Sequence, residues 1–328
     1  MSDLNTKKVE CKLLELLQTG FPFSREPYYE MGLEIGLSGA EIIRCISGLK
    51  QDGIVRQISP VMDARMLGYS STLVGMKVAK EVVGRAGQLV REHPGISHGY
   101  ERDNVFNIWV TLSARSESDI VVEMQRLASE IGADAIVNLP AIKVFKLRTN
   151  FSTEDNSRAE AEALDGFVLP GRAVFSELER EVINELQQDL PLTPDPFNIF
   201  AQHLNIPVES LLDVGQTLIQ RRVIRRYGAS INHYRAGYSA NAMTCWRVTA
   251  DRVEEIATRL ALLKQVSHCY ERVSNSSWTY NLFAMLHAGS RSDVQEIVKK
   301  IAAETELTDY AVLYSVKELK KARIRYPV

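Results

Sequence analysis

The chain has 328 residues, of which 45% are hydrophobic and 24% charged, and its formal net charge is −2. This length allows two or more domains, and the composition is ordinary for a globular protein. A net charge near zero gives no general attraction to nucleic acid or to an anionic membrane, and no apolar run approaches the roughly 20 residues of a membrane-spanning helix. The four cysteines lie far apart without CxxC spacing, which indicates a reducing compartment and predicts a cytoplasmic protein without a structural zinc site.

Residues 1–64 are predicted to form a winged helix. Apolar side chains recur at helical spacing from Asn5 to Gln18, and Ser38 and Glu41 form a capping box that begins a further helix. A Gly after Asp52 ends that helix, and alternating apolar and polar residues then begin a strand. Helices followed by a short ribbon are the order of a winged helix-turn-helix unit.

Residues 65–150 have the pattern of a ferredoxin-like domain. The predicted strands are Thr72–Val78, Gly95–Arg102, Phe106–Leu112 and Ala135–Lys146, and the predicted helices are Val82–Glu92 and Ser118–Ile131. The resulting order, βαββαβ, is that of a ferredoxin-like fold. Helices on one side of such a sheet leave its other face open to a ligand or to a partner sheet.

After a polar segment at 151–170, which is predicted to be a linker, the same order restarts. A second winged helix is predicted over 171–232 and a second ferredoxin-like domain over 233–328. The hexapeptide SHGYER that begins at Ser97 recurs as SHCYER at Ser267. The predicted fold is therefore α+β, a tandem duplication of a winged helix-turn-helix domain followed by a ferredoxin-like domain, which is the layout of Lrp/AsnC-like regulators.

That layout first suggests a transcription factor that senses a small molecule. A helix that reads the major groove needs Arg, Lys, Asn or Gln at the bases and cations near the phosphates. The third helix of the second unit, Val208–Gln220, contains Glu209 and Asp213 and no cation. Sequence-specific DNA binding is therefore not expected, and the winged units are predicted to be scaffold.

The stretch Val266–His287 is predicted to form a β-hairpin that is rich in polar and aromatic side chains. Buried polar groups need partners, so a hairpin that served only the core would favour aliphatic residues. Alternation places His268, Tyr270 and Arg272 on one face of the first strand, and Asn281, Met285 and His287 are expected on the open face of its partner. Each residue has a structural alternative, since a lone His, Trp or Tyr is commonly packed in a core and an Arg beside a Glu can be a surface pair. Three of the six His residues, His233, His268 and His287, nevertheless fall in or beside this domain, which favours a site.

The two halves resemble a known family. The second half, with IRRYGASINHYRAGYSANAM, VSHCYER, WTYNLFAMLH and YSVKELKK, resembles the B-type subunit of siroheme decarboxylase. The first half, with MLGYSSTLVGMKV, HPGISHGYERDNVFNIW and LPAIKVFKLR, resembles the A-type subunit. The resemblance covers almost the whole chain, and the members of this family are Lrp/AsnC-like proteins of the alternative haem and haem d1 pathways.

The resemblance implies a reaction and its requirements. Siroheme would lose CO2 from the acetate side chains at C12 and C18 to give 12,18-didecarboxysiroheme, with no redox or organic cofactor. The carboxylates that remain need cations, for which bidentate Arg is best suited. Each new methyl carbon needs a proton, which a His can deliver near neutral pH.

These requirements assign roles to particular residues. His233 and His287 are the favoured proton donors, and His268 is a third candidate or a ligand of the siroheme iron. The candidate carboxylate anchors are Arg235, Arg272, Lys317 and Lys320. The pocket is expected to be lined by Tyr238, Tyr270, Trp278, Tyr280, Asn281 and Met285.

The first half departs from this pattern, because Ala64 and Ser113 stand opposite His233 and His287. One competent site per chain is therefore expected, in the second half, although the retained His98 leaves a weaker second site open. Two other functions remain open: a regulator that senses a tetrapyrrole, and a carrier that binds siroheme without turnover. The duplicated chain is expected to pair its two halves within one molecule, as a monomer or as a homodimer of the fused unit.

Overall fold

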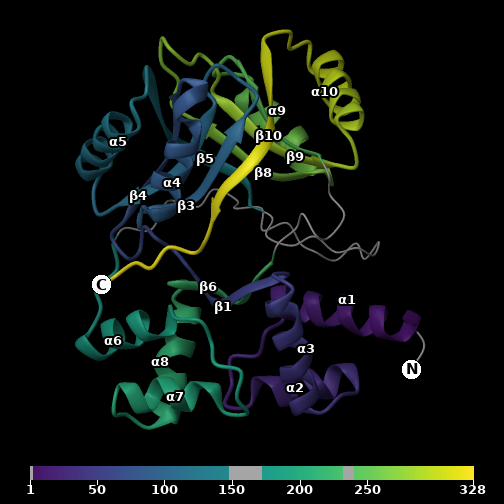
Figure 1. Ribbon diagram of the computed structural model, residues 1–328, viewed down its shortest axis with the longest axis vertical. Helices are drawn as coiled ribbons and strands as arrows, with labels where there is room; N and C mark the ends of the chain where they lie inside the picture. The colour runs from purple at the N-terminus through teal and green to yellow at the C-terminus, as the bar shows by residue number, and fades with distance from the viewer. Residues whose placement is uncertain (1–2, 148–171, 232–239) are drawn as a thin grey trace.

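Two layers make up the molecule, a β-barrel with helices around it and a layer of two winged-helix units that faces one end of the barrel (Figure 1). The structure is a computed structural model, and it describes residues 3–147, 172–231 and 240–328. The predicted linker at 151–170 lies outside the described residues. No helix within the described ranges has the length and apolar character needed to cross a membrane.

The winged-helix layer is built from two copies of one unit. The first copy contains α1 (Asp3–Thr19), α2 (Pro27–Ile35), α3 (Gly39–Gln51) and β1 (Val55–Met62), and the second contains α6 (Glu177–Leu186), α7 (Pro196–His203), α8 (Val208–Gln220) and β6 (Ile224–Ile231). The capping box that begins α3 is present, because the Ser38 side chain accepts from the Glu41 backbone and the Glu41 side chain accepts from the Ser38 backbone.

The two winged units share one sheet and one core. A ribbon is predicted within each unit, but β1 instead pairs antiparallel with β6 of the other unit, so each strand satisfies its backbone across the repeat. Buried side chains of both units form one hydrophobic cluster. Phe23 of the first unit packs so closely on α8 that a Cβ at Gly215 would lie 2.3 Å from its ring. Arg25 pairs with Asp195 and Glu209 of the second unit, each at 2.9 Å. These contacts engage α8 within the protein, which is consistent with a scaffold.

The barrel is built from two βαββαβ copies, as predicted. The first copy contains β2 (Ser70–Lys77), η1 (Lys80–Val82), α4 (Val83–Glu92), β3 (Ile96–Arg102), β4 (Ile108–Ala114), α5 (Glu117–Ile131) and β5 (Ala135–Leu147). The second contains β7 (Ala240–Trp246), α9 (Val253–Leu262), β8 (Val266–Arg272), β9 (Leu282–Ala288), α10 (Arg291–Thr305) and β10 (Tyr310–Lys321). The predicted fold class is confirmed, with strand orders β3-β4-β2-β5 and β8-β9-β7-β10.

The two sheets close on each other. The last strand of each copy pairs antiparallel with the second strand of the other, β10 with β3 and β5 with β8, and the result is a closed barrel. Closure leaves no strand edge unpaired. The open face of each ferredoxin-like sheet therefore becomes the inner wall of the barrel, while the helices lie outside (Figure 1).

The barrel interior is apolar over most of its length. Its buried members are Phe106, Trp109, Val137, Leu139, Met243, Cys245, Trp278, Phe283 and Leu313. The rings of Trp109 and Trp278 lie 5.0 Å apart at an edge-to-face angle of 68°. Two further clusters fill the space between the sheets and their helices. His268 lies with Lys321 at the barrel end that faces the winged-helix layer, where Arg56 of β1 donates to the Lys321 carbonyl at 2.7 Å.

Candidate functional site

A chain of hydrogen bonds joins two imidazole rings at this end of the barrel. The Oγ of Ser267 lies 2.7 Å from Nδ1 of His268 and 2.7 Å from Nε2 of His287. The other nitrogen of His287, Nδ1, lies 2.5 Å from Oδ1 of Asn241 on β7. Ser267 is only 1% exposed, so solvent does not compete for these bonds. Two predicted residues, His268 and His287, are thus brought together by two that the sequence analysis did not single out.

A β-bulge explains how Ser267 reaches both rings. Val266 pairs with Leu286 and His268 with Met285, so the register shifts between them and Ser267 is the extra residue. A bulge re-aims side chains relative to strict alternation. Ser267 therefore lies beside His268, whereas regular alternation along β8 would have placed it on the opposite face. In the sequence, the only indication that Ser267 belongs to the site is its position next to His268.

The hydrogen-bond pattern assigns the tautomers of both rings. With the Asn241 amide oriented as assigned, its Oδ1 can only accept, so Nδ1 of His287 carries the hydrogen. Nε2 of a neutral His287 then accepts the Ser267 hydroxyl proton, and the Ser267 oxygen accepts from Nδ1–H of His268. In the described part of the chain Nε2 of His268 has no hydrogen-bond partner. That nitrogen is the one available to a ligand.

An aromatic ring and a half-buried cation complete the wall beside His268. Tyr270 stacks on the imidazole with centroids 6.2 Å apart and planes inclined by 13°. The guanidinium carbon of Arg272 lies 4.7 Å from the Tyr270 ring centroid, and its Nη1 donates to the Leu139 carbonyl at 2.9 Å. Its Nε is buried without a hydrogen-bond partner, and no carboxylate among the described residues pairs with this guanidinium. Arg272 is half-buried, and a cation that is partly withdrawn from water without a counter-ion is costly, so Arg272 suits an anionic ligand.

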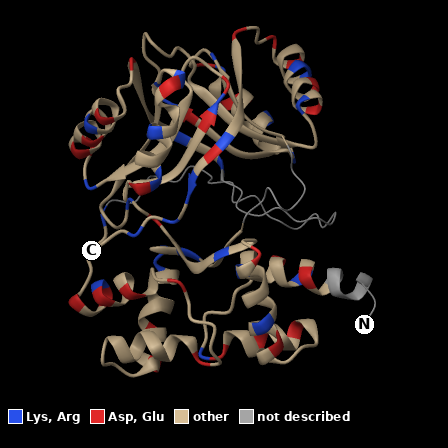
Figure 2. Ribbon diagram, viewed as in Figure 1, with Lys and Arg blue, Asp and Glu red and all other residues tan. Residues whose placement is uncertain are grey.

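The site is electropositive. Burial and then Lys321, Arg272 and Lys146 lower the pKa of His268 to about 4, because each disfavours the imidazolium. Burial likewise lowers the pKa of the Lys321 ammonium. Burial raises the pKa of Tyr270, while Arg272, Arg225 and Arg65 act in the opposite direction. Figure 2 shows Lys and Arg segments on the β1–β6 sheet where it faces the barrel. Lys321, Arg65 and Arg225 were not singled out from the sequence.

Comparison with known proteins places the chain in a family. The model for the siroheme decarboxylase NirDL-like HTH domain matches residues 10–56 and 179–225, and that for the AsnC-like ligand binding domain matches 66–146 and 235–320. A siroheme decarboxylase of Hydrogenobacter thermophilus is 36% identical over 317 residues, which span 96% of this chain and 94% of the relative. The chain belongs to the siroheme decarboxylase family. The family predicted from the sequence is confirmed.

Solved structures agree with this membership. The crystal structure of the siroheme decarboxylase NirDL matches with a TM-score of 0.71 at 32% sequence identity, covering 97% of this chain and 94% of that chain. The structure of NirDL in complex with an iron-uroporphyrin III analogue matches with the same values. The shared architecture therefore includes both layers rather than one domain alone.

In this member of the family, the C-terminal tail covers the first-half position that corresponds to His287. Ser97 Oγ lies 2.9 Å from Nδ1 of His98, but Ser113 occupies the position of His287. The Tyr326 hydroxyl interacts with the Ser113 side chain, and its ring lies 4.9 Å from that of Tyr69. The two halves thus differ where the second His would stand.

The ring of His98 is exposed to solvent. Although part of His98 meets solvent, desolvation by the surrounding protein and then the charges of Lys321, His268 and Arg56 lower the pKa of this imidazole. Solvent screens charges at an exposed ring, so we expect a smaller shift at His98 than at the half-buried His268.

Three predicted pocket residues, Trp278, Tyr280 and Asn281, lie at the Arg272 end of the hairpin, where the Arg272 N–H donates to the Asn281 carbonyl at 2.8 Å. Trp278 is buried and packs against Tyr280, with ring centroids 5.3 Å apart. The Asn281 amide bonds both the backbone N–H and the carbonyl of Val248, each at 2.9 Å. Asn107 makes the equivalent pair of bonds in the first half. This Asn therefore holds the barrel strands together in both copies, while Met285 stays beside His268 in the strand register.

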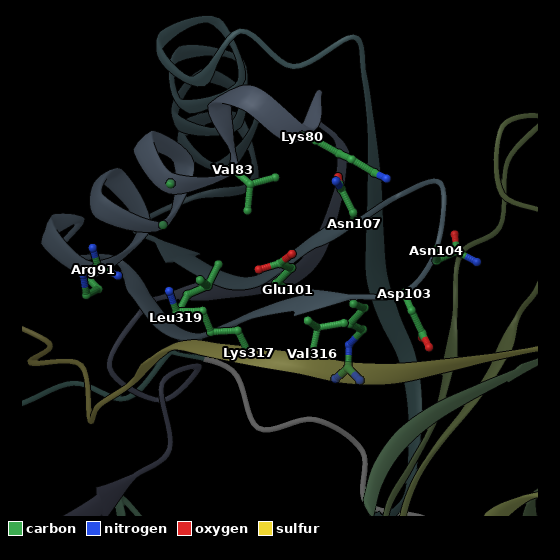
Figure 3. Close-up of a pocket in the computed structure, with 13 residues that line it drawn as sticks. Lys80, Val83, Arg91, Glu101, Asp103, Asn104, Asn107, Val316, Lys317 and Leu319 are labelled. Carbon is green, nitrogen blue, oxygen red and sulfur yellow. The ribbon is translucent and has the colours of Figure 1, made fainter. Parts of the chain in front are cut away.

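The predicted anchors Lys317 and Lys320 lie outside the barrel. Lys320 Nζ donates to the His93 carbonyl at 2.6 Å. Lys317 lines a separate pocket of about 560 Å³ between α4, β3 and β10 (Figure 3), whose wall includes the carboxylates of Glu101 and Asp103. Register shifts in β10 leave Lys321 as the lysine near His268.

The remaining predicted site residues, His233, Arg235 and Tyr238, lie outside the described residues.

Proposed function

We propose that this chain is a siroheme decarboxylase that removes CO2 from the C12 and C18 acetate groups at the His268–His287 site. The observation that carries the proposal is the pair of imidazoles joined through Ser267, on the same wall as the guanidinium of Arg272, which pairs with no carboxylate among the described residues. This arrangement holds a proton-donating group and an anion-binding group on one wall, in a chain that belongs to the family.

The cations of the site serve to hold the substrate. Siroheme carries several carboxylates, and Arg272 offers a planar guanidinium with donors that its single bond to Leu139 does not exhaust. Lys321 from β10 and Arg65 from the segment between β1 and β2 supply further positive charge near His268 and Tyr270. Binding energy at the carboxylates that are retained would orient the acetate that reacts.

The reaction needs one proton for each acetate. The bond between the methylene and carboxylate carbons breaks, its electron pair stays with the methylene carbon and the attached macrocycle, and CO2 leaves. A proton from Nε2 of His268 then completes the methyl group. The sum is –CH2–COO⁻ + H⁺ → –CH3 + CO2, which transfers no electrons, so no redox cofactor is required.

The electrostatics of the site favour loading that proton when the substrate binds. In the free protein burial and the neighbouring cations keep His268 neutral. Bound carboxylates would neutralise those cations and favour the imidazolium, which raises the pKa of His268. A general acid with a pKa near the working pH is the most effective donor. The aromatic and thioether walls formed by Tyr270, Phe283 and Met285 would also disfavour a carboxylate relative to neutral CO2.

The test is anaerobic incubation of the purified chain with siroheme, followed by mass spectrometry of the extracted tetrapyrrole. Loss of two CO2 units is expected. Loss of only one would mean that this chain handles one acetate position. Binding without loss of mass would contradict the proposal and favour a carrier or a sensor. A DNA-binding assay would then separate those two, although the engaged surface of α8 disfavours a DNA reader.

A further inference from the structure

We propose that Ser267 is a positioning and proton-relay residue, which couples His287 to His268 so that the two imidazoles deliver one proton from Nε2 of His268. This inference rests on the proposed function and deepens it. Ser267 has the required geometry, because one hydroxyl oxygen lies 2.7 Å from a nitrogen of each ring. It is also buried and held in a bulge between two paired strands.

The relay has two states that differ by one proton. The loaded state forms when His268 takes up a proton on Nε2, its Nδ1 proton moves to Ser267, and the Ser267 proton moves to Nε2 of His287. His287 then carries hydrogens on both nitrogens, its Nε2–H donates to Ser267, the Ser267 hydroxyl donates to Nδ1 of His268, and Nε2–H of His268 points to the ligand. When Nε2 of His268 gives its proton to the methylene carbon, the Ser267 proton moves to Nδ1 of His268 and the His287 proton moves to Ser267. The spent state has neutral rings and the pattern of donors found in the structure.

Asn241 gives the relay its direction. Its Oδ1 accepts from Nδ1 of His287 in both states, at 2.5 Å, so the exchangeable proton of His287 lies on Nε2, toward Ser267. An orienting hydrogen bond of this kind fixes the tautomer of a catalytic His. Solvent then reloads the spent relay with one proton for each CO2 released.

The first half of the chain provides an internal control. Ser97 bonds His98 there at 2.9 Å, in the same bulge position. The relay stops at that point, because Ser71 and Ser113 take the positions of Asn241 and His287. Substituting Ser97 therefore changes the same kind of Ser–His bond without breaking a link between two imidazoles.

The experiment compares Ser267→Ala, His287→Ala and the double variant, with Ser97→Ala as the control. If Ser267 transmits the contribution of His287, each single change and the double change lower kcat by a similar factor, about 10²-fold. KM is expected to change little, and Ser97→Ala is expected to keep parental kcat. The limb of the kcat–pH profile that reports His287 should be lost in all three variants. Multiplicative losses, or a parental pH profile in Ser267→Ala, would overturn the relay.

Two further measurements keep the test decisive. If Ser267→Ala does not fold, Ser267→Cys replaces it, since a thiol has similar size but is a much weaker donor; parental kcat in that variant would overturn the proposal. Nitrogen-15 NMR of the free protein reads the tautomers without turnover. His268 is expected as the Nδ1–H tautomer in the parent and as a mixture when the hydroxyl is absent, whereas Asn241 keeps His287 as the Nδ1–H tautomer in both proteins. An unchanged spectrum would refute the relay. This result does not depend on turnover, so it can be distinguished from a failure of the proposed function, in which the parent would not decarboxylate siroheme.

Discussion

Nη1 of Arg56, on β1 of the winged-helix layer, donates a hydrogen bond of 2.7 Å to the carbonyl of Lys321 at the end of β10. Its Nη2 pairs with Glu318 on the same strand, also at 2.7 Å. The winged-helix layer therefore holds the end of the strand that presents Lys321 to the site. Arg323 extends this link, because its Nη1 bonds the carbonyl of Gly228 on β6 at 2.9 Å. The helix-turn-helix layer thus supports one end of the barrel.

Replacing Arg56 with Ala should weaken both stability and siroheme binding. Glu318 would keep a largely buried carboxylate without its cation, which costs about 1–3 kcal/mol, and Lys321 would lose its positioning contact. Denaturant unfolding and absorbance titration with siroheme measure the two effects. Arg126→Ala is the matched control, because Arg126 pairs with Glu123 and Glu130 on the exposed face of α5 and such pairs contribute little. Equal behaviour of the two variants would contradict a supporting role for Arg56.

Replacing His268 with Ala should abolish turnover and leave siroheme binding largely intact. A general acid contributes about 10²–10⁴-fold to the rate, whereas Arg272 and Lys321 remain to hold carboxylates. Single-turnover decarboxylation and equilibrium binding are the measurements. His98→Ala is the control, since the first half lacks a second imidazole beside that ring. A loss of binding in parallel with turnover would instead make His268 an anchor or a ligand of the siroheme iron.

The fold could be predicted from the sequence because its determinants are local. Helical spacing, the capping box at Ser38 and strand alternation each depend on only a few neighbouring residues. The repeated hexapeptide indicated that the chain is a tandem duplication. Pairing of β1 with β6 and closure of the barrel join segments far apart in the chain, so no local pattern specified them. The polar, alternating strands were consistent with an open face as well as with an inner wall.

The site was predicted only in part, for a related reason. His268, Tyr270 and Arg272 were grouped correctly because alternation holds across them. The bulge at Ser267 breaks alternation and moves a buried hydroxyl between two rings, which a period of two residues does not reveal. The Asn281 side chain has hydrogen-bonding groups that could bind a ligand, but its amide bonds the backbone of Val248 instead. Regular alternation would place the side chains of Lys317 and Lys321 on the same face of β10. The register shifts in β10 place them on different faces.

Siroheme binding should take up a proton in the neutral pH range. The pKa of His268 is about 4 in the free protein, and bound carboxylates raise it, so affinity should strengthen as the pH falls from the raised value toward about 4. Calorimetry in buffers of different ionisation enthalpy counts the protons. His268→Gln should lose the uptake, whereas His98→Gln should retain most of it. Uptake that is the same in all three proteins would rule out His268 as its source.

The same group makes the free protein sensitive to acid. The folded pKa of about 4 lies below the ordinary value of 6.5, so between these values the unfolded chain binds more protons than the folded one. The free energy of unfolding therefore falls as the pH is lowered from about 6.5 to about 4, and the contribution of His268 is fully retained above 6.5. His268→Gln should flatten that part of the stability profile. A profile with the parental slope would contradict the lowered pKa.

Removing the end of the C-terminal tail should open the first-half counterpart of the site without creating activity there. Tyr326 covers Ser113 and is tied to α6 through two hydrogen bonds with Gln187, of 2.6 and 3.2 Å. A chain that ends at Ile324 keeps the Arg323 anchor and loses this cover, so siroheme stoichiometry should rise from one to two per chain. Turnover per chain should stay the same, because the opened position has a Ser in place of His287. A chain lacking only Val328 is the control, and a stoichiometry of one in both truncations would show that the tail is not what closes the first half.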